Sequence, residues 1–237
     1  MLFSILIFLV YFLIGSFIGN AATSFIFRIP RELPLCGFNL KPICGGMCGL
    51  ELKFKDFVPI YRYFFISKFC KCGKYSIPSI YPVAEVTSGL AIAFIGLKFH
   101  DNEYDLLRYV VLFFGFLVNA CIYKIHNRLF QNSVWIFAFC MLVFIALNRS
   151  DMELIDIFCK LFLCGSFLNF ITKKNPIDPL VFRFFIISIA GLTWFASLIF
   201  CLINLLTFVV FKNINNHVRL SVNFITLFIL LFFGIYG

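Results

Sequence analysis

Long apolar runs, interrupted by short polar segments, set the pattern of this sequence. A helix needs roughly 20 apolar residues to cross a bilayer core about 30 Å thick, and the runs approach that length repeatedly. They cover residues 1–27, 81–99, 106–123, 134–147, 154–171, 180–192, 194–211 and 220–236. The pattern predicts an all-α, polytopic membrane helix bundle of about eight transmembrane helices.

The stretch 180–211 can be divided in two ways. A hairpin near Gly191 would return the chain to its starting side and keep the basic segment 212–219 inside. A single tilted helix is the alternative, because hydrophobic mismatch costs only fractions of a kcal/mol per Å. The charge pattern favours the hairpin.

The distribution of basic residues predicts the orientation. Residues 28–79 carry nine Lys and Arg residues, which places them in the cytoplasm under the positive-inside rule. The first run has its basic residues, Arg28 and Arg31, after it, so it is a retained helix rather than a secretory signal. We therefore expect a first transmembrane helix (1–27), a small cysteine-containing cytoplasmic loop domain (28–79) and a transmembrane bundle (80–237).

Composition supports the membrane assignment. Of the 237 residues, 62% are hydrophobic and 13% are charged, which is too apolar for an ordinary soluble domain. The net charge of +9 lies in short segments between apolar runs, where Lys and Arg attract anionic lipid headgroups. The lipid bilayer is the expected partner of this charge, and nucleic-acid binding is not expected.

Four short runs contain residues with possible chemistry, and they follow one another in a recognisable order. Residues 19–30 read GNAATSFIFRIP, and residues 81–85 read YPVAE. Two cysteine pairs lie between these runs. Further on come residues 119–129, NACIYKIHNRL, and residues 175–180, NPIDPL.

This order resembles the prepilin peptidases, membrane aspartic enzymes that cleave type IV pilin-like precursors at the cytoplasmic face of the bacterial inner membrane. The resemblance implies an endopeptidase with a pilin or pseudopilin precursor as its substrate. It places the second catalytic aspartate at Asp178 and the first at Asn119, where this chain has an amide. Family members often also methylate the new amino terminus with S-adenosylmethionine. Asp156 with Lys160 is a less well fitting alternative for the second position.

The cysteine pairs are Cys44 with Cys48 and Cys70 with Cys72, and Cys36 is a spare thiol. Four thiolates can close a tetrahedral zinc site and organise a loop that is too short to bury its own core. Free reduced thiols are the alternative, whereas a disulfide is disfavoured in a reducing compartment. The other five cysteines lie in apolar runs and are expected to be packing residues.

The amide at Asn119 has a direct chemical consequence. Asparagine can donate a hydrogen bond as a protonated acid does, but it cannot take up or release the proton during hydrolysis. Loss of one general acid or base costs roughly 100-fold to 10,000-fold in rate. The chain is therefore either an impaired pseudo-peptidase that binds pilin-like or assembly partners, or an enzyme that has recruited another acid.

Each candidate residue also has a structural explanation. Glu85 is the better replacement acid, ahead of Asp56, but an interfacial charge paired with a basic residue explains it too. Asp178 before Pro179 has the residue types of a helix N-cap. Asn119 could form an interhelical hydrogen bond. His126 near the interface is more often solvated than a proton shuttle.

A transporter is a third hypothesis. Lys160 and Arg183 fall within apolar runs, and ionisable residues inside a membrane can line a substrate pathway.

Overall fold

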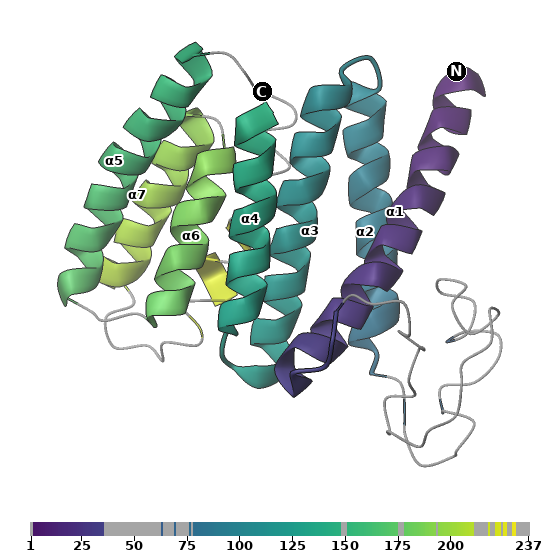
Figure 1. The fold of residues 1–237 in the computed structure, drawn as a ribbon, viewed down its shortest axis with the longest axis horizontal. Helices are drawn as coiled ribbons and strands as arrows, with labels where there is room; N and C mark the ends of the chain where they lie inside the picture. Colours follow the sequence, from purple (N-terminus) through teal and green to yellow (C-terminus); the bar gives the residue numbers. More distant parts are fainter. Residues whose placement is uncertain are drawn as a thin grey trace. The chain divides into compact units, whose positions relative to one another are not determined.

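The structure is a computed structural model. It describes residues 2–35, Tyr63, Phe69, Ser76, 78–147, 151–174, 178–192, 194–210 and parts of 218–230. These residues form a membrane helix bundle of the predicted all-α class (Figure 1). Its elements are α1 (Leu2–Arg28), the 3-10 helix η1 (Ile29–Arg31), α2 (Ile80–Phe99), α3 (Glu103–His126), α4 (Gln131–Leu147), α5 (Asp151–Lys174), α6 (Pro179–Gly191) and α7 (Trp194–Val210).

The helices extend beyond the apolar runs where polar residues suit a helix end. α3 was expected over residues 106–123, but it begins at Glu103 and ends at His126. Its first turn carries Glu103 and Asp105, and the Asn102 side chain accepts a hydrogen bond from the Asp105 N–H at 3.2 Å. Acidic residues at the start of a helix and basic ones at its end are favourable for its dipole.

The stretch 180–211 is a hairpin, as the charge pattern predicted. α6 ends at Gly191, Leu192 is extended, and α7 begins at Trp194. Phe185 and Phe200 lie on either side of this break, and their ring centroids are 5.3 Å apart. The single tilted helix is therefore wrong. For the expected last helix, the described positions 221–223, 225–226 and 229–230 are helical.

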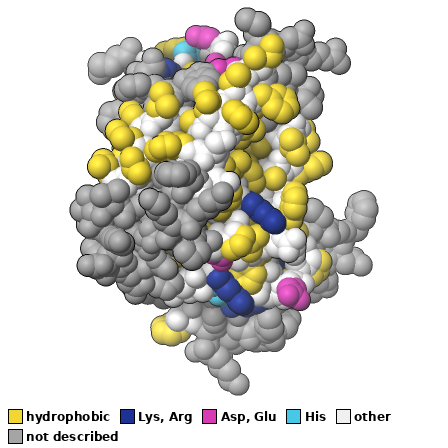
Figure 2. All heavy atoms as spheres, turned by 90° about the vertical axis from the view of Figure 1, so that its left-hand side faces the viewer, with side chains coloured by type: hydrophobic (Ala, Val, Ile, Leu, Met, Phe, Trp, Pro, Cys, Tyr) yellow, Lys and Arg dark blue, Asp and Glu magenta, His cyan; other side chains and the backbone are white. Residues whose placement is uncertain are grey.

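Three of the described helices are long and apolar enough to cross a membrane. They comprise Phe3–Arg31, Ile80–Phe99 and Glu103–His126, and shorter apolar helices follow them. Figure 2 shows hydrophobic side chains over much of the described surface on this face. Phe139, Phe158 and Phe162 are 67%, 72% and 74% exposed, which suits contact with lipid. These observations identify a membrane protein, and the number of crossings stays a prediction.

The chain divides into two compact units. The first comprises Met1–Leu106 and Leu117–Ile122, and the second comprises Leu107–Phe116 and Tyr123–Gly237. In the first unit, α1 and α2 pack very closely. A Cβ at Gly15 would lie 2.6 Å from the Ser88 carbonyl oxygen, and a Cβ at Gly19 would lie 2.8 Å from the Glu85 Cα. Only glycine permits this approach, and small residues commonly mediate it between membrane helices.

The second unit has an aromatic core. Phe184 and Phe185 of α6 are buried, and their ring centroids are 6.0 Å apart. Phe184 also lies 5.6 Å from Phe137 of α4, so this ring cluster joins α4, α6 and α7. Aromatic side chains bury large areas without requiring close backbone approach.

Candidate functional site

The predicted zinc ligands lie outside the described residues. This applies to Cys44, Cys48, Cys70 and Cys72, and also to Cys36 and Asp56. Among the residues that the structure describes, no group of three or more His, Cys, Asp or Glu side chains could hold a metal ion. The zinc site therefore stays a prediction.

Glu85 lies where α2 packs against α1 in the first unit. Its side chain is buried, and the Asn20 side-chain amide donates a hydrogen bond to its Oε1 at 3.2 Å. One turn further along α2, the Ser88 hydroxyl donates to the Gly15 carbonyl oxygen at 2.7 Å. This contact joins residues 19–30 with residues 81–85, two of the runs that carry the family resemblance. Sequence reasoning identified both runs but did not predict their contact.

Asn119 lies on α3 in the part of that helix that belongs to the first unit, and it is 1% exposed. A neutral amide is compatible with this burial, because amides can be fully hydrogen-bonded without carrying a charge. A carboxylate there would need a proton or a charged partner. The burial thus distinguishes Asn119 from the solvent-exposed Asp178.

Asp178 belongs to the second unit and caps α6. Its side-chain Oδ1 accepts a hydrogen bond from the Leu180 N–H at 2.8 Å, and Pro179 occupies the first helical turn. The predicted N-cap is therefore confirmed. Because the carboxylate is exposed and held by the helix end, it is accessible to water and fixed in orientation.

Tyr123 is a neighbour of Asp178 that sequence reasoning missed. It lies in the last turn of α3 and is 6% exposed, and the Asp178 charge acts on its hydroxyl. A signal was available, because Tyr123 follows Asn119 by one helical turn. Its position inside an apolar run made it look like a packing residue.

Asn127 explains why α3 ends where it does. Its φ of 53° is left-handed, a conformation that asparagine tolerates better than most residues, and its N–H donates to the Tyr123 carbonyl oxygen at 2.8 Å. The His126 ring lies edge-to-face on Phe130 with centroids 5.6 Å apart. This end of α3 therefore has specific local structure.

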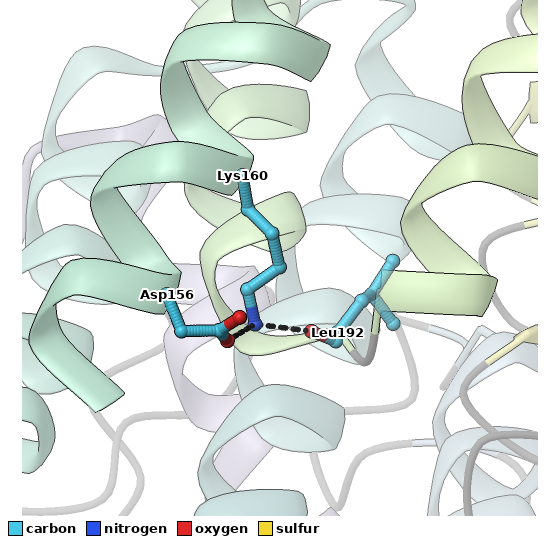
Figure 3. A network of polar contacts seen from close by, with 3 residues as sticks. All are labelled: Asp156, Lys160 and Leu192. Atoms are coloured by element: carbon cyan, nitrogen blue, oxygen red, sulfur yellow. Dashed lines mark hydrogen bonds and ion pairs between the residues drawn. The ribbon is translucent and has the colours of Figure 1, made fainter. Parts of the chain in front are cut away.

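Lys160 and Asp156 form an ion pair on α5, with 2.8 Å between Nζ and Oδ2 (Figure 3). Lys160 also donates to the Leu192 carbonyl oxygen, at 3.1 Å. Its side chain is 3% exposed, whereas that of Asp156 is 39% exposed. Arg183 on α6 is exposed. The Asp156 carboxylate is thus already engaged with a neighbouring cation.

Comparison with protein families matches residues 13–99 to the family described as Bacterial Peptidase A24 N-terminal domain. The matched segment contains α2, most of α1, and the two cysteine pairs. Both predicted catalytic positions, Asn119 and Asp178, lie beyond it. Comparison with curated proteins and with solved structures gives no match.

Proposed function

We propose that this chain, which is related through residues 13–99 to the prepilin peptidase family, acts as a membrane aspartic endopeptidase on type IV pilin-like or pseudopilin precursors. It would do so as a multi-pass protein of the bacterial inner membrane, at the cytoplasmic face. The observation that carries the proposal is the exposed carboxylate of Asp178, held at the start of α6 by the Leu180 N–H.

The Asp178 carboxylate can accept a proton from a water molecule that attacks the scissile carbonyl. Its hydrogen bond to a helix N-terminus keeps one oxygen fixed and leaves the other available. Aspartic proteolysis also requires a group that holds a proton near the carbonyl oxygen of the substrate. The family resemblance assigns that role to the position of Asn119, whose amide can donate a hydrogen bond but cannot exchange a proton, so we expect slow turnover.

Glu85 is the proposed replacement for the missing acid. Glu85 is buried against α1, and a carboxyl group that carries a proton can donate it as a general acid. The Asn20 amide orients this side chain. The role predicts that Glu85→Gln reduces cleavage, while Asn20→Asp, which places a second carboxyl group beside it, changes its pH dependence.

Purified protein in proteoliposomes, mixed with a pilin-like precursor, tests the proposal. Wild-type protein should cleave the leader slowly, and Asp178→Asn should abolish cleavage because the amide cannot accept the proton. Asn119→Asp should increase the rate by roughly 100-fold or more, since it restores a general acid. Cleavage that survives in Asp178→Asn would exclude Asp178 as the catalytic group.

A second function, binding without cleavage, is favoured by the neutral amide of Asn119. In that case the wild-type protein would retain the precursor in a pull-down from detergent without shortening it. Gain of cleavage in Asn119→Asp, from no activity in the wild type, would identify a pseudo-peptidase that binds pilin-like or assembly partners.

Two accessory features belong to the same proposal. Cys44, Cys48, Cys70 and Cys72 would hold zinc as four thiolates, and metal analysis should find about one zinc per chain that is lost in Cys70→Ser. Methyl transfer from S-adenosylmethionine to the new amino terminus would appear as labelled product with methyl-labelled donor. Absence of zinc from the purified wild-type protein would refute the metal proposal.

A further inference from the structure

The contact between Lys160 and Leu192 lies at the opposite end of α6 from Asp178. The helix has 13 residues and is therefore about 20 Å long. One end carries the Asp178 cap, and the other ends at the Leu192 carbonyl oxygen that accepts from Lys160 (Figure 3). Both ends of this short helix are thus fixed by a side chain.

The C-terminal contact satisfies a need created by the hairpin. The last carbonyl groups of a helix lack intrahelical partners, and in a membrane water is not present to replace them. Leu192 is 2% exposed, and its carbonyl oxygen receives a charged donor from α5. A cation also interacts favourably with the negative end of the helix dipole.

The body of α6 is rigid enough to couple its two ends. Val181, Phe184, Phe185 and Ile189 are at most 2% exposed, and Phe185 packs on Phe200 of α7. Close-packed interiors transmit a shift rather than absorb it. A change at the Leu192 end is therefore expected to move the helix as a unit.

We infer that Lys160 is a positioning residue for Asp178. Lys160 anchors the C-terminal end of α6 by binding the Leu192 carbonyl oxygen. Because α6 moves as a unit, this anchor sets the position of the Asp178 carboxylate at the other end of the helix. The inference rests on the proposed function, because it concerns the residue that would activate water. Asp156 keeps the Lys160 ammonium paired and oriented toward Leu192.

A labelling experiment tests the positioning without relying on catalysis. A cysteine is introduced by Asp178→Cys, and its reaction rate with a maleimide is followed in proteoliposomes by peptide-resolved mass spectrometry. Adding Lys160→Met should change this rate by at least about threefold, as expected for loss of a helix-terminal hydrogen bond. Lys160→Arg retains the cation and should keep the rate close to that of the parent.

Arg183→Met is the matched control, because it removes an exposed cation from α6 without touching Leu192. The labelling rate of the introduced cysteine in this control should equal that of the parent. If Lys160→Met does not fold, the double variant Asp156→Leu with Lys160→Met replaces it, since removing both partners leaves no unpaired charge beside the buried position 160. An unchanged rate in the double variant would overturn the inference.

Cleavage supplies a second readout with Asp178 intact. Lys160→Met should lower kcat with little change in KM, and Lys160→Arg should restore kcat, because the cation retains the contact. Absence of cleavage in every variant, together with altered labelling at position 178, would refute the proposed peptidase activity and leave the positioning role supported. Normal cleavage and normal labelling in the Lys160 variants would refute the positioning role alone.

Discussion

The helices of the α1–α2 pair and those of the α4–α7 group pack against one another through different kinds of contact. In the pair, Gly15 and Gly19 allow backbone to touch backbone, and Ser88 adds a buried hydrogen bond. In the group, the side chains of Phe137, Phe184, Phe185 and Phe200 fill the space between the helices. Backbone contact tolerates few residue types, whereas a bulky apolar core tolerates many combinations. The family match over residues 13–99 covers α2 and most of α1.

The largest expected effect is the loss of stability in Gly15→Ala, which adds a methyl group between α1 and α2. Gly165→Ala makes the same change in the second unit and serves as the comparison. Gly15→Ala would place a Cβ against the backbone at Ser88, so we expect a loss of about 1–3 kcal/mol. At Gly165 on α5 the nearest atom is the flexible Ile186 Cδ1, 3.2 Å away. Gly165→Ala should therefore be neutral or slightly stabilising, because alanine favours helix. Thermal unfolding in detergent compares the two, and equal losses would remove the distinction between the regions.

A smaller effect is expected at the start of α6. Asp178→Ala removes the cap on Leu180 and should cost about 0.5–2 kcal/mol, whereas Asp178→Asn retains a capping oxygen and should be nearly neutral. Unfolding measurements on both variants, beside their cleavage rates, separate the cap from the chemistry. Cleavage lost in both variants with stability lost only in Asp178→Ala is the expected result.

Ser88→Ala should cost about 0.6 kcal/mol, a typical value for a hydrogen bond between membrane helices. Its stability is measured in the same way, with Ser188→Ala as the control, since the Ser188 hydroxyl bonds to Phe184 on its own helix. If only Ser188→Ala lost stability, the Ser88 hydrogen bond would contribute nothing measurable, and the close packing of α1 on α2 alone would hold the pair together.

The smallest effect concerns activity rather than stability. Tyr123→Phe removes the hydroxyl on which the Asp178 charge acts, and it should slow cleavage by about twofold, because a weak electrostatic contact is lost. Tyr109→Phe on the same helix serves as a control of similar burial. Equal rates in both variants would exclude a role for Tyr123 in the site.

The features that the sequence predicted correctly are local ones, which depend on residues close together in the chain. The helices follow from apolar runs, the hairpin from the charges on either side of 180–211, and the Asp178 cap from the proline after it. Long-range partners were not predictable, because nothing in the local pattern links Asn20 to Glu85 or Lys160 to Leu192. The amide at Asn119 was visible from the sequence, but its nearly complete burial was not.

The buried charge of Lys160 also constrains how the protein enters the membrane during synthesis. On insertion scales, a lysine at the centre of a helix costs about 2.5–3.5 kcal/mol, so α5 alone would be a poor substrate for lateral release into lipid. Its ammonium finds the Leu192 carbonyl oxygen only after α6 has been made. We therefore expect the insertion machinery to retain α5 until the following hairpin emerges, so that the three helices enter the bilayer together.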